Sequence, residues 1–319
     1  MSSSARGRAG RAPGTLSPAG GSRGAGPTRP DGPGRARSGR ASSPSSGPRR
    51  RRRGPGWVPQ QHGAWAMLVA PPLVGAAAVG PRWEHLLLLV VWLVGFCAYN
   101  AAGLWLKARR RPRWLPPVRA YGVATVLLGA ALLTAAPSLL TWGVAYVPLL
   151  AASLVYSARR DERSLANDLL TVVAAGLMAV VAAGVPVATE PGGLARWTAL
   201  TWFPGAEDAR AWALAAVLVA YFAGTVLYVK TMIRERGNRT MLRASVLYHA
   251  VLPVVLLGAA ALVPTLGSLL PVPTLAVLLA VLAVRAVVVP LRWPGATPKA
   301  LGIGEIVATT ALVVALLAG

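Results

Sequence analysis

The amino-acid sequence predicts an all-α integral membrane bundle of about nine transmembrane helices, on three observations. Of the 319 residues, 55% are hydrophobic and 13% are charged, whereas a soluble domain carries about 25% charged residues. Nine apolar runs approach the roughly 20 residues that a helix needs to cross the hydrocarbon core of a bilayer. These runs are apolar on every side and do not alternate with polar residues, which favours helices over the strands of a membrane β-barrel.

The nine predicted helices follow one another from residue 64 to the last residue. The first, fourth and sixth runs are short, so we expect them to tilt little or to extend past the limits of the apolar run. In chain order, the predicted spans are Ala64–Gly80, His85–Leu106, Val118–Ala136, Leu139–Tyr156, Asp168–Val187, Trp212–Val229, Ala244–Val263, Leu269–Val289 and Leu301–Gly319.

Residues 1–56 differ from the rest, because they contain no Ile, Val, Phe, Tyr or Trp and are rich in Ser, Gly, Pro and Arg. Such a composition cannot form a core and predicts a disordered cytoplasmic tail, attracted to anionic lipid. Contact with nucleic acid and a start codon placed too far upstream are the alternatives, and no specific nucleic-acid partner is expected. The predicted domains are therefore this tail, 1–56, and a transmembrane helical domain, 57–319.

The basic residues outside the tail predict the orientation of the chain in the membrane. Of the 33 Lys and Arg residues, 13 lie in the first 53 positions, and the other 20 divide unequally between the two sides of the predicted bundle. Seventeen lie in or next to the connections that follow the second, fourth, sixth and eighth spans, and three lie on the other side of the bundle. Positive charge stays cytoplasmic, so we expect the N-terminus inside and the C-terminus outside.

The predicted outer side carries few polar residues. Its one long connection, Ala188–Ala211, contains Trp197 and Trp202, and tryptophans of this kind are typical of a segment that lies at the membrane interface. Glu84 and His85, at the outer end of the second span, are expected to be interfacial as well.

The inner ends of the predicted spans collect polar and charged residues instead. A polar layer on one side of an apolar helix bundle indicates a cavity open to the cytoplasm, and its many cations favour an anionic ligand. The candidate cavity residues are His62, Asn100, Lys107, Asn167, Asp168, Tyr228, Lys230, Arg234, Glu235, His249, Arg285 and Glu305. No residue among them is assigned a catalytic role.

Glu305 is the most informative of these residues, since it follows the start of the last predicted span by only a few positions. A carboxylate inside the bilayer is costly and indicates function or pairing. Arg285 lies at a similar depth in the preceding span, so a structural Glu305–Arg285 ion pair, a role in binding or proton transfer, and simple snorkelling all remain open. The lysines and arginines at the inner helix ends also fit the positive-inside rule alone.

A structural role also explains three other candidate residues. Asp168, together with Asn167, can cap the start of the fifth span. His249 can be a hydrogen-bonded packing residue. His62, beside Gln60 and Gln61, can satisfy the first N–H groups of the first helix, or it can face the cavity.

Two inner-edge stretches are alike, and four strings indicate a family. AYNAAGLWLKARRR begins at Ala98 and AYFAGTVLYVKTMIRER at Ala220, which indicates either an internal repeat or chance similarity.

The strings QHGAWAML, SLANDLL, YVKTMIRERGN and PKALGIGE resemble the YwiC-like family of bacterial membrane proteins, and the helix pattern resembles the UbiA-type intramembrane prenyltransferases. The resemblance implies a UbiA-like bundle in the bacterial cytoplasmic membrane.

The sequence departs from the prenyltransferase pattern at the metal site. That family carries Asn-x-x-x-Asp-x-x-x-Asp, whose carboxylates bind Mg²⁺ and through it a diphosphate. Here Asn100 matches the asparagine, but Leu104 and Ala108 stand at the aspartate positions, and Glu235 is the only acid in the second motif. Because Mg²⁺ requires carboxylate oxygens, we expect neither a Mg²⁺–diphosphate site nor any other cofactor.

Three functions are compatible with these residues. The first is binding of an anionic lipid or isoprenoid in the cytoplasm-facing cavity, with metal-independent transfer chemistry as an extension. The second is transport, with Glu305 and His249 as titratable groups. The third is a non-catalytic membrane scaffold, with membrane lipids as its partners.

The unequal distribution of basic residues generates a topology prediction. A cysteine introduced by Arg160→Cys should react with a membrane-impermeant thiol reagent only from the cytoplasmic side, and one introduced by Leu200→Cys only from the outside. The parent chain, which contains only Cys97, supplies the background labelling. Reaction of both cysteines from the same side would contradict the predicted topology.

Overall fold

The computed structural model describes residues 56–59, 64–161, 163–190 and 192–318, all of which belong to one compact unit, Arg52–Gly319. Within these residues the regular structure is helical and includes no strand, so the predicted all-α class is confirmed. The predicted tail, up to residue 55, and the candidate His62 lie outside the described residues.

Eight helices of this unit are long and apolar enough to cross a membrane, which makes the chain a multi-pass membrane protein. The first predicted span forms a shorter apolar helix, α1 (Ala64–Val79). The eight long helical segments are α2 (Trp83–Lys107), α3 (Leu115–Ala135) together with η1 (Pro112–Trp114), α4 (Gly143–Ala158) together with η2 (Pro137–Trp142), α5 (Leu165–Ala183), α8 (Ala209–Ile233), α9 (Arg239–Leu262), α11 (Val272–Arg292) and α12 (Pro298–Leu317). The other short helical turns are α6 (Val185–Ala188), α7 (Ala195–Thr198) and α10 (Leu266–Leu269).

Polar side chains fix the starts of several long helices. Ser164 caps α5, where its hydroxyl accepts a hydrogen bond from the backbone N–H of Asn167. The expectation that Asp168 caps this helix is therefore wrong, because the helix begins one turn earlier and Asp168 lies in its first turn. Asn238 caps α9 and Thr297 caps α12 in the same manner, as is usual for these residue types.

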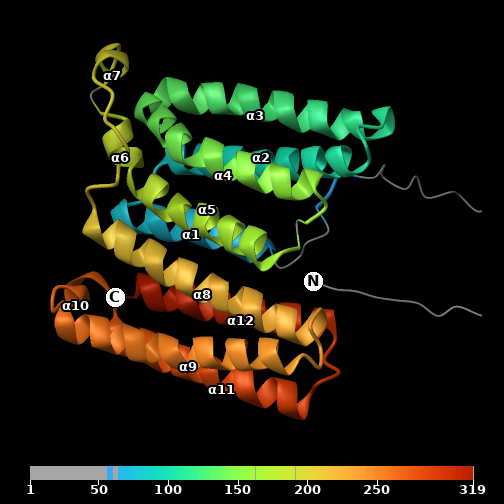
Figure 1. Cartoon of the computed structure of the whole chain (residues 1–319). Helices are drawn as coiled ribbons and strands as arrows, with labels where there is room; N and C mark the ends of the chain where they lie inside the picture. The colour runs from blue at the N-terminus through green and yellow to red at the C-terminus, as the bar shows by residue number, and fades with distance from the viewer. Residues whose placement is uncertain (1–55, 60–63, 162, 191, 319) are drawn as a thin grey trace, which may run out of the picture. The chain divides into compact units, whose positions relative to one another are not determined.

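The helices lie side by side with their long axes roughly along one direction (Figure 1). In the middle of the unit α1 packs against α5, and α5 packs against α8. The backbones of α1 and α5 touch at Gly75, where a Cβ atom would overlap the carbonyl oxygen of Ala179. Small residues that allow such close approach are common between membrane helices. On either side, α2 packs with α3 and α4, and α9 packs with α11.

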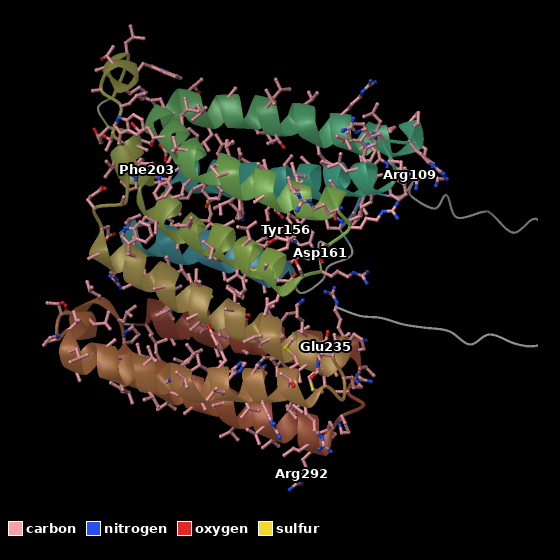
Figure 2. The ribbon with its side chains drawn as sticks, in the orientation of Figure 1. Arg109, Tyr156, Asp161, Phe203, Glu235 and Arg292 are labelled. Carbon is pink, nitrogen blue, oxygen red and sulfur yellow. The ribbon has the colours of Figure 1, made fainter. Side chains whose placement is uncertain are left out.

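The connections between helices alternate between two ends of the unit (Figure 1). The connections that follow α2, α4, α8 and α11 lie at one end, where Figure 2 labels Arg109, Asp161, Glu235 and Arg292. We call this the basic end, because most of the Lys and Arg residues of 56–319 lie in or beside these connections. The other connections lie at the opposite end, where Phe203 is labelled.

Candidate functional site

Arg285 of α11 and Glu305 of α12 form an ion pair inside the bundle. The Nη2 atom of Arg285 lies 2.9 Å from Oε1 of Glu305, and the Glu305 side chain is only 7% exposed. The Arg285 guanidinium also lies over the aromatic ring of Tyr228 on α8, with Cζ 4.4 Å from the ring centroid. This cation–π contact adds to the ion pair. Of the three readings of Glu305, the ion pair is the one that the structure shows, and it excludes simple snorkelling.

Hydroxyl groups complete the surroundings of Glu305. The Thr225 hydroxyl of α8 donates a hydrogen bond of 3.1 Å to Oε2 of Glu305. One turn deeper, the hydroxyls of Tyr221 and Thr309 lie 3.0 Å apart and join the same two helices. The carboxylate is therefore held by α8 as well as by α11.

His249 of α9 packs against this group of residues. Its Nδ1 lies 2.7 Å from the carbonyl oxygen of Ser245, and a carbonyl only accepts, so Nδ1 carries a proton. The imidazole meets the ring of Tyr228 edge-on, with 6.5 Å between the centroids. Gly224 leaves room for the imidazole, since a Cβ atom at this position would lie only 3.0 Å from Nε2. His249 is thus a buried, hydrogen-bonded residue beside the ion pair. We call Thr225, Tyr228, His249, Arg285 and Glu305 the Arg285 cluster.

A pocket of about 630 Å³ lies next to the Arg285 cluster, between α8, the end of α11 and the start of α12. Tyr228 and Arg285 form one part of its wall, and its other polar lining residues are Arg292 and Thr297. The remaining lining is apolar and includes Val289, Trp293, Leu301 and Gly304. We call it the Arg292 pocket.

Arg292 differs from Arg285 in that its charge is not compensated. Its side chain is exposed at the basic end (Figure 2). Among the described residues it has neither an ion-pair partner nor a side-chain hydrogen bond, whereas Arg285 is paired with Glu305. The Arg292 pocket is therefore mostly apolar with one uncompensated cation in its lining.

Lys230 belongs to a different ion pair. Its Nζ lies 2.9 Å from Oδ2 of Asp168 and donates a hydrogen bond of 2.6 Å to the carbonyl oxygen of Arg163. These contacts join α8 to the start of α5. Lys230 does not line the Arg292 pocket, and the structure shows Lys230 and Glu305 in two separate ion pairs.

A chain of polar side chains lies near the Lys230–Asp168 pair. The hydroxyl of Ser153 donates a hydrogen bond of 2.7 Å to Oδ1 of Asn167, and the hydroxyl of Tyr99 lies 2.7 Å from that of Ser153. This chain connects α2, α4 and α5. Tyr99 and Tyr221 belong to the Ala-Tyr pairs that begin the two similar stretches, and each bonds a hydroxyl on another helix. An internal repeat stays a prediction.

The other candidate residues lie outside the Arg292 pocket. Nδ2 of Asn100 is buried without a hydrogen-bond partner in the described part of the chain. Glu235 accepts a hydrogen bond of 3.0 Å from Asn238 in the connection after α8, and Arg234 is the C-cap residue of α8. Lys107 is the last residue of α2. Within the described ranges, no three His, Cys, Asp or Glu side chains are close enough to share a metal ion.

Sequence reasoning missed three residues of this site, namely Thr225, Thr309 and Arg292. The two threonines carry no recognisable signal, because a threonine inside an apolar helix often bonds its own backbone. Arg292 could have been found from the sequence, because it is followed by Trp-Pro-Gly. These residues end α11 and leave the arginine beside an irregular connection.

Comparison with known proteins places the chain in a family. The family model described as YwiC-like protein matches residues 58–183. A protein of Bacillus subtilis (strain 168) called "Uncharacterized protein YwiC" is 32% identical over 204 residues, which are 63% of this chain and 78% of the relative. The chain belongs to the YwiC-like family. A Haemophilus influenzae protein called "Uncharacterized protein" is 28% identical over 206 residues, 63% of this chain and 77% of its own.

The family match covers Asn167 and Asp168 but no residue of the Arg285 cluster or of the lining of the Arg292 pocket. It includes QHGAWAML and SLANDLL but ends before the other two strings and before the Arg285 cluster. No solved structure matches the chain, so the resemblance to the UbiA-type prenyltransferases stays a prediction. Neither relative's name states a ligand or a reaction, and function has to be argued from the site.

The buried ion pair generates a stability prediction. Arg285→Met should lower the free energy of unfolding by about 3–5 kcal/mol, because it leaves the Glu305 carboxylate buried without its cation. Replacing both partners, in Arg285→Met with Glu305→Leu, should restore most of this loss. Thermal unfolding in detergent measures both effects.

Arg292→Met is the matched control for this prediction. It makes the same substitution on the same helix at an exposed residue with no ion pair in the described structure, and should change stability by less than about 0.5 kcal/mol. Equal destabilisation by the single and the double substitution would show that the ion pair is not the stabilising contact.

Proposed function

We propose that this protein binds an anionic amphiphile, a lipid or isoprenoid with a negatively charged head group, in the Arg292 pocket. The observation that carries the proposal is the uncompensated charge of Arg292 in the lining of a mostly apolar pocket of about 630 Å³. An apolar cavity with a few well-placed polar groups is the usual form of a small-molecule site.

The chemistry of the pocket fits the two parts of such a ligand. The guanidinium of Arg292 has N–H groups that fork onto phosphate or carboxylate oxygens without a metal ion. Val289, Trp293 and Leu301 supply apolar surface for the chain of the ligand. Thr297 begins α12 at the same pocket, so the positive end of that helix dipole adds to the attraction for an anion.

The position of the pocket indicates from where the ligand enters. The pocket lies at the basic end, which the positive-inside rule assigns to the cytoplasm. In this proposal the protein resides in the bacterial cytoplasmic membrane and takes its ligand from the cytoplasmic leaflet. The proposed function is binding, and a transfer reaction would be an extension for which the lining residues supply no second substrate site.

Transport is the second candidate, and one observation favours it. Arg285 and Glu305 are a buried ion pair in the membrane-spanning helices α11 and α12, directly beside the pocket, and ionisable residues inside a membrane commonly mark transport pathways. Proteoliposomes loaded with the same amphiphile distinguish the two functions, because a transporter moves it across the bilayer and a binding protein does not.

The role of Arg292 generates a binding prediction. Arg292→Gln should weaken the binding of farnesyl monophosphate about tenfold or more, because a hydrogen bond to a charged group contributes about 1.5–3 kcal/mol. Lys299→Gln is the matched control, since it removes an exposed cation from the first turn of α12 that does not line the pocket. Titration of the purified protein in detergent gives both affinities.

Two further measurements complete this test. Farnesol, which has the same chain and no charge, should bind more weakly than the phosphate, and EDTA should leave phosphate binding unchanged. Equal effects of the two substitutions would indicate a non-specific response to net charge. Loss of binding on chelation, restored by Mg²⁺, would contradict the metal-free site.

The volume of the pocket generates a second prediction. Gly304 lines the pocket, and a Cβ atom there would meet no described atom within 4 Å. Gly304→Leu should therefore abolish the binding of farnesyl monophosphate by filling the pocket, without lowering the thermal stability. Gly302→Leu is equally free of contacts and does not line the pocket, so it should keep the wild-type affinity. Unchanged binding in Gly304→Leu would exclude this pocket as the site.

A further inference from the structure

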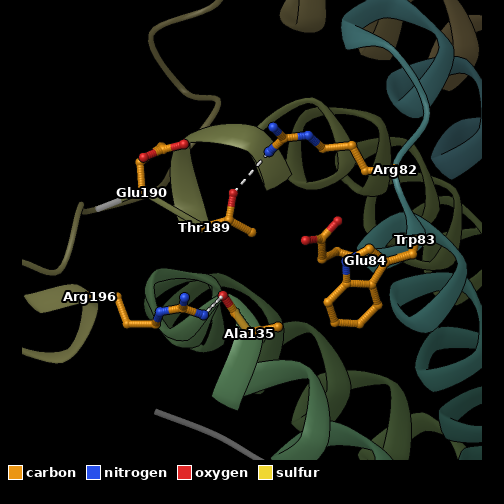
Figure 3. Close-up of a pocket in the computed structure, with 7 residues that line it drawn as sticks. All are labelled: Arg82, Trp83, Glu84, Ala135, Thr189, Glu190 and Arg196. Atoms are coloured by element: carbon orange, nitrogen blue, oxygen red, sulfur yellow. Dashed lines mark hydrogen bonds between the residues drawn. The ribbon is translucent and has the colours of Figure 1, made fainter. Parts of the chain in front are cut away.

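A second pocket, of about 520 Å³, lies at the end of the unit opposite to the Arg292 pocket. It is formed by the start of α2, the end of α3 and the segment of α6 and α7 (Figure 3). Its charged lining residues are Arg82, Glu84, Glu190 and Arg196, with Thr189 and Trp83 between them. This pocket is independent of the proposed function.

Glu84 is the unusual residue of this pocket. It is only 9% exposed, and its Oε2 atom is buried without a hydrogen-bond partner among the described residues. Figure 3 shows its carboxylate extending from α2 into the space between Trp83 and Thr189. A buried charged oxygen without a hydrogen-bond donor is costly. A ligand in the pocket can supply the missing donor to this carboxylate.

The backbone that carries Glu84 is held in place by the next residue. The N–H of Arg82 donates a hydrogen bond of 2.9 Å to Nδ1 of His85. The proton of the ring therefore lies on Nε2, which donates a hydrogen bond of 3.0 Å to the carbonyl oxygen of Ala182 on α5. Glu84 and His85 are thus buried against the protein, and their expected place at the level of the membrane interface stays a prediction.

Two arginines flank Glu84 without neutralising it. Nη1 of Arg82 donates a hydrogen bond of 3.1 Å to the Thr189 hydroxyl. Nη1 of Arg196 donates to the carbonyl oxygens of Thr134 and Ala135, at 3.1 and 2.8 Å. These bonds orient both guanidinium groups (Figure 3). Their Nη2 groups have no partner in the described structure, and neither arginine forms an ion pair there with Glu84 or Glu190.

We propose that this pocket binds a small zwitterionic group that carries a primary ammonium and a phosphate or carboxylate. The ammonium donates hydrogen bonds to Oε2 of Glu84, which satisfies the buried carboxylate. The anionic part accepts hydrogen bonds from the Nη2 groups of Arg82 and Arg196. The ligand thereby supplies a partner for Glu84, Arg82 and Arg196.

The arrangement fits a zwitterion better than an inorganic cation. Ca²⁺ and Mg²⁺ take several oxygen ligands, whereas Glu84 has two guanidinium groups as neighbours in the pocket, and these repel a metal ion. A ligand with one charge only would leave either the carboxylate or the arginines without a partner.

Two sources can supply this chemistry. Trp83 lines the pocket and is 63% exposed, and tryptophans at the ends of membrane helices lie at the level of the lipid head groups. A lipid with a phosphoethanolamine head group is therefore one source. A free zwitterion from the solution is the other.

The test compares ammonium groups with and without hydrogens. The full-length protein is titrated with free O-phosphoethanolamine and with phosphocholine, and it is reconstituted in nanodiscs that contain phosphatidylethanolamine or only phosphatidylcholine for native mass spectrometry. We expect the choline compound to bind at least about tenfold more weakly, because its trimethylated nitrogen has no N–H donor for Glu84. Binding of the lipid alone identifies the head group as the source, and binding of the free compound identifies a soluble zwitterion.

Variants and a shorter ligand complete the test. Glu84→Gln should weaken binding about tenfold or more, whereas Glu207→Gln, which lies at the same end but does not line the pocket, should not. Ethanolamine, which lacks the phosphate, should bind more weakly than O-phosphoethanolamine. Equal binding of the ethanolamine and choline compounds, or no binding of any of them, would overturn the proposal. That comparison uses the wild-type protein, so it decides the question even if Glu84→Gln does not fold.

Discussion

The ion pair of Arg285 and Glu305 is the interaction on which the second half of the bundle depends. A carboxylate placed inside a membrane helix costs about 2.5–3.5 kcal/mol at the centre of the bilayer on insertion scales, so α12 requires a cation at the same depth. Arg285 provides it from α11, and the guanidinium rests on the ring of Tyr228 of α8. Because Thr225 of α8 bonds the same carboxylate, one charge fixes the relative positions of three helices.

The same cost explains why both pockets lie at helix ends. Inside the bundle a buried charge is stabilised by its partner, as Arg285 is by Glu305, whereas an unpaired charge has to remain close to water. Arg292 lies at the basic end, and Arg82 and Arg196 lie at the opposite end. There the Thr189 hydroxyl orients Arg82, and the last carbonyl groups of α3 orient Arg196. The two candidate binding sites are thus found where the membrane permits uncompensated charge.

The sequence predicted the helices well and their partners less well. Apolar runs locate the spans, but α9 and α12 begin before the predicted starts at Ala244 and Leu301, because the first turns of these helices are polar and capped by Asn238 and Thr297. The Arg285–Glu305 pair was foreseeable from the matching depth of two charges. The partner of Lys230 was not, since depth alone does not show that α5 is the neighbour that brings Asp168 within reach.

The balance of charge around the Arg292 pocket also bears on which anion the proposed site selects. Glu305 neutralises Arg285, so an entering head group meets the net charge of Arg292 alone. A diphosphate carries more negative charge than one arginine can compensate, and the UbiA-type prenyltransferases, to which a likeness stays a prediction, meet that demand with carboxylate-bound Mg²⁺. Leu104 and Ala108 replace those carboxylates here, and Lys230 already forms an ion pair with Asp168. The proposed site therefore suits a head group of one or two negative charges, such as a carboxylate, a phosphodiester or a monophosphate, better than a diphosphate.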